Sequence, residues 1–308
     1  MKKDIQRTKS EFKEKLRSFA EGLTPYTLTD EGHWSVKGFI DVFKNVYAIS
    51  SDTKVVSKII EIHLLPRILE FARENGFAVV LADHQNWYPD FSFVYRDDPT
   101  TKFAVDIKTT YRDPAYPGHC NGFTLGSHGT YFINRDSKKN IQYPYKDYLA
   151  HLCMGIIYTR CDIENSCPSG IYRVKELFSE SGAFSRGQIP SSSETMVESL
   201  RSIVSVVKDF QFFVREKWEI ASDSSGSGNT ANIGSITKID DILSGNGVFK
   251  KLGEKWFDAY WMNYGKITIN DSRGKPKKIT KLEEFLRYRG KDPGLIYPRA
   301  PKSGKVTK

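Results

Sequence analysis

The segment from 91 to 107 constrains the fold of this chain more than any other. Phe91–Tyr95 and Phe103–Ile107 are short runs rich in aromatic and β-branched residues, which is typical of strands. The residues between them, RDDPTTK at 96–102, have the Asp, Pro and Thr content of a tight turn. The sequence therefore predicts an antiparallel hairpin, in which a turn centred on Asp98 pairs residues whose numbers sum to 196.

Three charged residues gather on this predicted hairpin. The register sets Asp90 opposite Asp106, and directly opposed residues have Cβ atoms about 5 Å apart. Two carboxylates that close repel each other unless a cation or a proton lies between them. Lys108 follows Asp106 by two positions, so both side chains point to the same face of the strand. The hairpin is thus expected to present two carboxylates and one ammonium group on one surface.

Such a cluster suits the hydrolysis of a phosphodiester bond. Mg²⁺ prefers oxygen ligands and keeps several waters, so two carboxylates and a phosphate oxygen can complete its shell. The metal neutralises charge in the transition state and lowers the pKa of a bound water. The lysine could orient that water, stabilise the anion or assist deprotonation, and the residues do not choose among these roles. The bare pattern also occurs in hairpins with ordinary salt bridges, so chemistry is one of two interpretations here.

The other elements predict an α+β fold with a mixed central sheet flanked by helices. Apolar residues of 8–23 recur at helical spacing, and 34–49 favours strands. A long helix is expected to begin at Ser51 or Asp52, to kink at Pro66 and to end at Gly76, followed by a strand over 77–82. We further predict helices over 145–160, 197–207 and 254–264, a strand over 210–221, and surface loops over 179–194 and 223–234.

Length and composition limit the class of protein. The 308 residues suffice for one large domain or two small ones. No apolar run is long enough to span a membrane, and no apolar segment follows the first basic residues, so we expect a cytoplasmic protein. The four cysteines, Cys120, Cys153, Cys161 and Cys167, form no C-x-x-C pair and are expected to be reduced and structural. A disulfide or a zinc site is the weaker alternative.

The net charge of +9 is concentrated near the C-terminus. Residues 250–308 contain 16 Lys and Arg against 6 Asp and Glu, whereas the rest of the chain is nearly neutral. Basic residues such as those in 273–278, with Arg287, Arg289 and Lys291, could lie along a phosphate backbone. A solvated tail that binds nothing in particular explains the charge equally well.

Several ordered blocks resemble the EcoRV-like family of type II restriction endonucleases, within the PD-(D/E)xK nuclease superfamily. The blocks extend from about residue 30 to 265, and the DIKTTY and GSGNT blocks together are highly specific. They are SDTKV at 51–55, YPDF at 88–91, DIKTTY at 106–111, FTLG at 123–126, GSGNT at 226–230 and NIGSI at 232–236.

The resemblance implies roles for the charged residues. Asp90 and Asp106 match the family's metal-binding carboxylates, Lys108 matches its catalytic lysine, and Mg²⁺ is the implied cofactor. Glu61 matches a further acidic residue near the active site. An ordinary solvated carboxylate on a helix is the alternative interpretation of Glu61.

The resemblance also implies DNA contacts. The loop over 223–236 matches the segment that reads bases in the major groove, where glycines allow close backbone approach and Asn can bond to adenine. Its implied readers are Gly226, Gly228, Asn229, Thr230 and Asn232. The implied minor-groove contacts are Gln85 and Asn86, and the implied phosphate contacts are Thr53, Thr110, Tyr111 and Lys139. His84, Trp87 and Ala231 depart from the family pattern, which puts the inner base preference in doubt.

These observations predict a single restriction-endonuclease-like domain over 1–308 that works as a homodimer. We expect a dimerisation element at about 27–50, a catalytic core over 51–178, an inserted surface loop over 179–200 and a basic region over 250–308. The expected reaction is Mg²⁺-dependent cleavage of double-stranded DNA at a GATATC-like palindrome, giving blunt ends with 5′-phosphates. A cognate DNA methyltransferase is expected in the same system, but not as a stable partner. The rival interpretations are a DNA-binding protein without catalysis and a structure-specific repair nuclease on the same core.

Overall fold

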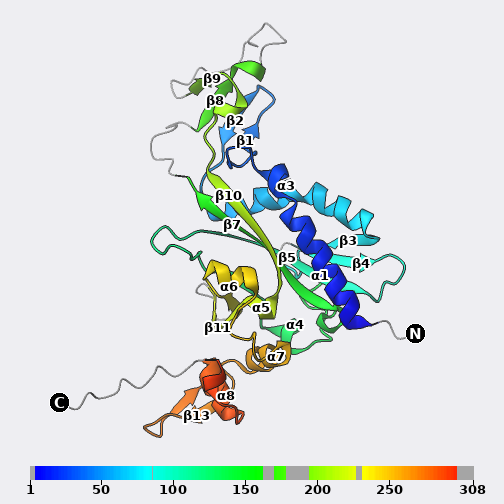
Figure 1. Cartoon of the computed structure of the whole chain (residues 1–308), viewed down its shortest axis with the longest axis vertical. Helices are drawn as coiled ribbons and strands as arrows, with labels where there is room; N and C mark the ends of the chain where they lie inside the picture. The colour runs from blue at the N-terminus through cyan, green and yellow to red at the C-terminus, as the bar shows by residue number, and fades with distance from the viewer. Residues whose placement is uncertain (1–3, 85, 162–169, 178–193, 227–230, 297–308) are drawn as a thin grey trace, which may run out of the picture.

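A five-stranded mixed sheet forms the centre of the molecule (Figure 1). The computed structural model describes residues 4–84, 86–161, 170–177, 194–226 and 231–296. The strand order is β10-β7-β5-β4-β3, with β5 and β7 parallel and the other neighbours antiparallel. The strands are β3 (Phe77–Leu81), β4 (Phe91–Tyr95), β5 (Lys102–Tyr111), β7 (Ala150–Arg160) and β10 (Val207–Glu216). The expected α+β class with a mixed sheet is confirmed.

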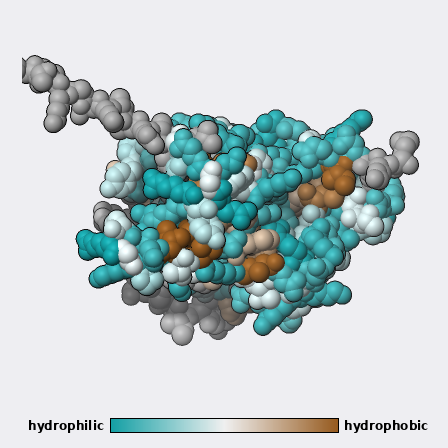
Figure 2. Space-filling model, turned by 90° about the horizontal axis from the view of Figure 1, so that it is seen from below, coloured by the Kyte–Doolittle hydropathy of each residue, from teal (hydrophilic) through white to brown (hydrophobic). Residues whose placement is uncertain are grey.

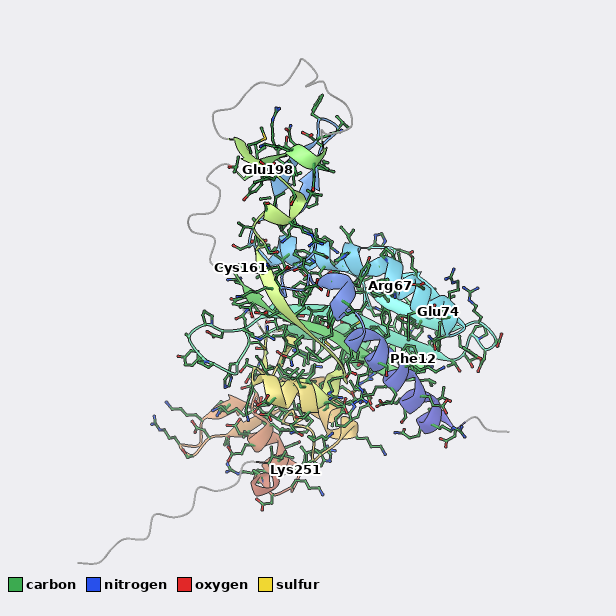
Figure 3. All side chains as sticks on the ribbon, turned by 45° about the horizontal axis from the view of Figure 1, so that its top comes forward. Phe12, Arg67, Glu74, Cys161, Glu198 and Lys251 are labelled. Atoms are coloured by element: carbon green, nitrogen blue, oxygen red, sulfur yellow. The ribbon has the colours of Figure 1, made fainter. Side chains whose placement is uncertain are left out.

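Two long helices, α1 (Ile5–Glu21) and α3 (Thr53–Glu74), pack on one face of this sheet (Figure 1). Phe12, labelled on α1 in Figure 3, stacks on Phe103 of β5 with ring centroids 3.9 Å apart. Asp52 caps α3 by accepting hydrogen bonds from the backbone of Lys54 and Val55, as the sequence predicted. Burial of the aromatic side chains fixes the helices and the sheet as one core.

A second buried cluster covers the opposite face of the sheet. A three-stranded sheet of order β11-β12-β6 belongs to this half of the molecule, as do most of the remaining helices. The strands are β6 (Thr124–Ser127), β11 (Ala221–Ser225) and β12 (Asn232–Ser235), and the helices are α4 (Thr130–Ile133), α5 (Lys217–Ile220), α6 (Ile239–Ser244), α7 (Glu254–Asn263) and α8 (Leu282–Tyr288). The predicted aromatic helix over 254–264 is therefore confirmed as α7.

The basic C-terminal region lies at the lower end of the molecule in Figure 1. A hairpin of β13 (Thr268–Asn270) and β14 (Pro276–Lys278) precedes α8 there. Figure 2 looks at the molecule from this side and shows a largely hydrophilic surface with small apolar patches. The short elements α2 (Thr24–Thr27), η1 (Tyr145–Asp147), η2 (Lys175–Leu177), η3 (Leu200–Ser202) and η4 (Pro293–Leu295) complete the fold.

A separate four-stranded sheet of order β1-β2-β8-β9 stands at the upper end of Figure 1. Its strands are β1 (Gly38–Ile40), β2 (Asn45–Ala48), β8 (Ile171–Val174) and β9 (Glu194–Val197). We call it the peripheral sheet. Figure 3 labels Glu198 beside it, far from Lys251 at the opposite end of the molecule. The strands predicted within 34–49 are thus confirmed and belong to this sheet.

Two predicted helices are wrong. The segment 145–160 contains only the turn η1 before strand β7. Because β7 lies between β5 and β10 and is buried on both faces, its residues are almost all apolar and lack the alternation that identifies a half-exposed strand. The segment 197–207 holds the end of β9, the turn η3 and the start of β10. The strand predicted over 210–221 also ends early, because α5 begins at Lys217.

The inserted surface loop predicted over 179–200 is wrong at its C-terminal end. Residues 194–197 form β9, which pairs in parallel with β8, whereas residues 178–193 lie outside the described part of the chain. Within the described residues, Cys120 and Cys153 are free thiols, and no helix is long and apolar enough to cross a membrane. Cys167 lies outside the described residues.

Candidate active site

The β4–β5 hairpin has the predicted register. Phe91 pairs with Val105 and Phe93 with Phe103, so the paired numbers sum to 196. The alignment extends to Asp90, whose backbone N–H donates to Oδ1 of Asp106 at 3.1 Å. In return, Oδ2 of Asp90 accepts a hydrogen bond from the backbone N–H of Ile107 at 2.8 Å. The two strands are therefore joined through the side chains of both aspartates.

Alternation along β5 decides which face carries the charged residues. Phe103, Val105 and Ile107 belong to the core cluster beneath α1 and α3. Asp106 and Lys108, at the intervening positions, face the other side. There Nζ of Lys108 lies 3.4 Å from Oδ2 of Asp106 and 3.7 Å from Oδ2 of Asp90. All three charged side chains line one cavity of about 490 Å³.

The two aspartates have different environments. Asp106 is 4% exposed, and although burial would raise its pKa, the charges of Lys108 and Lys217 hold that pKa at about 2. Burial raises the pKa of Asp90 to about 6; the charge of Lys108 opposes this rise, and the charges of Asp106 and Glu61 add to it. Asp106 is thus firmly ionised, whereas Asp90 gives up its proton at a higher pH than an ordinary aspartate, mainly because it is buried.

Lys217 is a charged residue of this site that the sequence analysis missed. It is the first residue of α5 and is 4% exposed. Its Nζ donates to Oδ2 of Asp106 at 2.9 Å and lies 3.8 Å from the centre of the Tyr88 ring. Burial lowers the pKa of Lys217, with Lys108 acting in the same direction and Asp106 opposing it. No local pattern in the sequence distinguishes this lysine from an exposed one.

Ion pairs on the outer side of α5 fix that helix. Glu216 and Glu219 form a capping box, in which Oε2 of Glu219 accepts from the backbone N–H of Glu216 at 2.9 Å. Lys13 of α1 lies 2.6 Å from Oε2 of Glu219, and Lys9 pairs with Glu216. These largely buried charges are mutually satisfied, so they can hold α5 against α1.

Glu61 lies next to the cluster without joining it directly. With Thr53, it lines an adjacent cavity of about 430 Å³ that also contains Asp90 and Lys108. The carboxylate of Glu61 pairs with Lys58 one turn earlier on α3. Both interpretations of Glu61, a member of the site and a helix-surface carboxylate, are compatible with this geometry.

The structure places some of the predicted DNA contacts at the cavity of the aspartates, and others lie elsewhere or outside the described residues. Asn86, Lys139 and Asn232 line the same cavity as the aspartates. The backbone of Gly226 packs closely against Thr124, because an added Cβ would lie 2.8 Å from Cγ2 of Thr124. Gln85, Gly228, Asn229 and Thr230 lie outside the described residues.

Thr110 and Tyr111 belong to neither cavity. Thr110 is 5% exposed, and its hydroxyl donates to the carbonyl oxygen of Asn121 at 2.5 Å. The guanidinium of Arg160 lies 3.5 Å from the centre of the Tyr111 ring. The geometry does not support a phosphate contact by the Thr110 side chain.

The donor set suits a hard divalent cation. Among the described residues, no group of three or more His, Cys, Asp or Glu side chains converges. The pair Asp90 and Asp106 supplies carboxylate oxygens, and the pKa of Asp90 is raised first by burial and then by repulsion from Asp106 and Glu61, effects that a bound cation would offset. A cation that keeps several waters and accepts substrate oxygens, as Mg²⁺ does, fits two protein carboxylates.

Comparison with known proteins gives two matches. The family model described as Restriction endonuclease EcoRV matches residues 30–186 and 183–290. The type II restriction enzyme EcoRV of Escherichia coli is 35% identical over 266 residues, which cover 86% of this chain and 96% of that enzyme. The residues matched by the family model include the hairpin, the peripheral sheet and α5.

Proposed function

The chain belongs to the EcoRV family of restriction endonucleases, and we propose that it is a type II enzyme that cleaves double-stranded DNA at a short palindrome with Mg²⁺ as cofactor. The observation that carries this proposal is the meeting of Asp90, Asp106 and Lys108 at one cavity. The family relationship and the chemistry of the three side chains support the same reaction.

In the proposed mechanism the carboxylates of Asp90 and Asp106 hold the metal ion. When bound, Mg²⁺ supplies positive charge to the scissile phosphate and acidifies a water ligand. Asp90 must lose its proton to serve as a ligand; burial raises the pKa of this carboxyl to about 6 in the metal-free protein, and a bound cation would lower it. Lys108 donates hydrogen bonds to the attacking water or to a phosphate oxygen. Hydrolysis then leaves a 5′-phosphate and a 3′-hydroxyl group.

We assign the reading of the target to the 223–236 segment; the prediction of a loop over its whole length is wrong, because residues 223–225 belong to β11 and residues 232–235 to β12. Gly226, Gly228, Asn229, Thr230 and Asn232 are the proposed base readers, and the retained GSGNT block favours a GATATC-like site with a blunt central cut. Gln85 and Asn86 are proposed at the minor groove, and Thr53 and Lys139 at phosphates. The lining of the catalytic cavity by Asn86, Lys139 and Asn232 supports a DNA path past the aspartates.

We propose that two copies of the chain act together. A two-fold symmetric dimer matches a palindromic target and brings one active site to each strand. The peripheral sheet supports this assignment because Phe39, Ile40 and Phe43 are each more than half exposed on it or its turn. Such apolar side chains are typical of a surface that another protein covers.

The test is a plasmid digest with and without Mg²⁺, followed by sequencing of the ends. We expect cuts at one palindrome only when the metal is present. Lys108→Met and Asp106→Asn should each lower the rate at least ~10³-fold. Lys15→Met, which removes an exposed lysine of α1 on the other side of the central sheet, is the matched control and should cleave normally. Metal-independent DNA binding without cleavage would instead favour the non-catalytic rival, and cuts directed by DNA structure would favour the repair nuclease.

A further inference from the structure

Two lysines share one oxygen of Asp106, but they are bound differently. Nζ of Lys217 lies 2.9 Å from Oδ2 of Asp106, and Nζ of Lys108 lies 3.4 Å from the same atom. The Lys217 side chain is 5% exposed, whereas that of Lys108 is 23% exposed and also faces Asp90. Lys217 is therefore the closer and more deeply enclosed cation.

The structure encloses Lys217 on several sides. The capping box of Glu216 and Glu219 fixes the helix that begins at Lys217. The ring of Tyr88 covers the ammonium group at 3.8 Å, an arrangement that favours a cation. Gly126, with a φ of +99°, leaves room where a Cβ would lie 3.1 Å from Nζ of Lys217. Little space remains for the ammonium group of Lys217 to leave Asp106.

We propose that Lys217 is the permanent counter-ion of Asp106 and is a positioning residue that leaves Lys108 free to act on water and phosphate. A buried carboxylate that loses its only cation is strongly destabilised. If Lys108 were the sole partner of Asp106, any movement of its ammonium group toward DNA would carry that cost. With Lys217 in place, Asp106 stays paired and oriented while Lys108 moves. The role of Lys108 in this inference rests on the proposed function.

The first test needs neither metal nor cleavage, so it can fail independently of the proposed function. Urea unfolding of the metal-free protein is measured for Lys217→Met, Lys108→Met and Asp106→Asn, and for both doubles with Asp106→Asn. We expect the Lys217–Asp106 coupling to change the unfolding equilibrium constant by at least ~10-fold, and to exceed the Lys108–Asp106 coupling. Equal couplings, or a larger one for Lys108, overturn the proposal.

The second test separates positioning from a merely structural role. In Mg²⁺-dependent cleavage, Lys217→Met should lower kcat by ~10- to 100-fold and leave KM for DNA unchanged, because the lost group acts through Asp106 and Lys108. Lys13→Met is the matched control, since it also removes a largely buried ammonium group paired to α5, but on the side facing α1. It should lower stability and leave kcat unchanged.

An unchanged kcat in folded Lys217→Met overturns the proposal, as does an equal loss of kcat in Lys13→Met. If Lys217→Met does not fold, Lys217→Gln takes its place in both tests, since it keeps an N–H donor without the charge. If the wild-type protein cuts no DNA, the proposed function is contradicted, but the unfolding test still decides whether Lys217 is the counter-ion of Asp106.

Discussion

The β4–β5 hairpin and the peripheral sheet are supported in opposite ways. The hairpin lies between two large buried clusters, one under α1 and α3 and one under α5–α8. Among the described residues, the core of the peripheral sheet consists of four buried residues, Val46, Tyr172, Val174 and Ile203. It also leaves Phe39 and Ile40 more than half exposed, and Val42 in the following turn 90% exposed. The packing of the chain itself therefore fixes the proposed catalytic groups. The peripheral sheet, in contrast, exposes apolar surface that a partner could cover.

The largest expected effect is on stability at the hairpin. Phe103→Ala should lower the free energy of unfolding by about 3–5 kcal/mol, because it removes the ring on which Phe12 stacks and leaves a cavity. Phe39→Ala, on the peripheral sheet, should change the unfolding of the isolated chain far less. Urea titration of dilute protein measures both. Comparable losses of stability in the two variants would show that the peripheral sheet depends on its own packing as much as the hairpin does.

The next effect concerns association. Phe39→Asp should raise the dissociation constant of the proposed dimer by about 30-fold or more, because a buried interface anchor contributes about 2 kcal/mol or more. Sedimentation across a range of concentrations provides the measurement. Ile5→Asp is the control, since Ile5 is 58% exposed on α1 and belongs to neither sheet. An unchanged dissociation constant in Phe39→Asp assigns the dimer contact to another surface.

A smaller effect is expected from the charge of Asp90. Its folded-state pKa of about 6 exceeds its usual value of 3.8, so ionised Asp90 destabilises the metal-free fold as the pH rises through 6. Asp90→Asn should therefore add about 1 kcal/mol of stability at pH 8, after allowance for solvent screening of this partly exposed group. The gain should shrink as the pH falls from 6 and vanish below about pH 3.8, where Asp90 carries its proton in the folded and the unfolded chain alike. Urea unfolding at the two pH values tests the sign, and destabilisation at pH 8 contradicts it.

The smallest effect is expected at Glu61, which lies beside Asp90 and pairs with Lys58. Because its carboxylate pairs with Lys58, Glu61→Gln should slow cleavage by less than about 10-fold, which corresponds to less than about 1.4 kcal/mol in the barrier. Single-turnover rates at saturating Mg²⁺ provide the measurement. A loss as large as that of Asp106→Asn would instead make Glu61 a metal ligand.

The sequence predicted the parts of the site that depend on local pattern. The turn at Asp98 and the alternation of Phe103, Val105 and Ile107 sufficed for the register and for the shared face of Asp106 and Lys108. The resemblance then supplied roles for these residues. Lys217 could not be predicted, because it reaches Asp106 from 111 positions away by tertiary packing. Tertiary packing also explains why β7 was predicted as a helix, since burial on both faces leaves a strand without the alternation of apolar and polar residues.

The parallel pairing of β8 and β9 has a consequence for the segment between them. Antiparallel neighbours can be joined by two residues, but parallel neighbours need a crossover of a dozen or more, since the chain must return to the end of the sheet from which it started. The length between Val174 and Glu194 is therefore a requirement of topology and not surplus sequence. If this segment were shortened to a hairpin turn, β9 could no longer pair in parallel with β8, and the peripheral sheet would lose this edge strand.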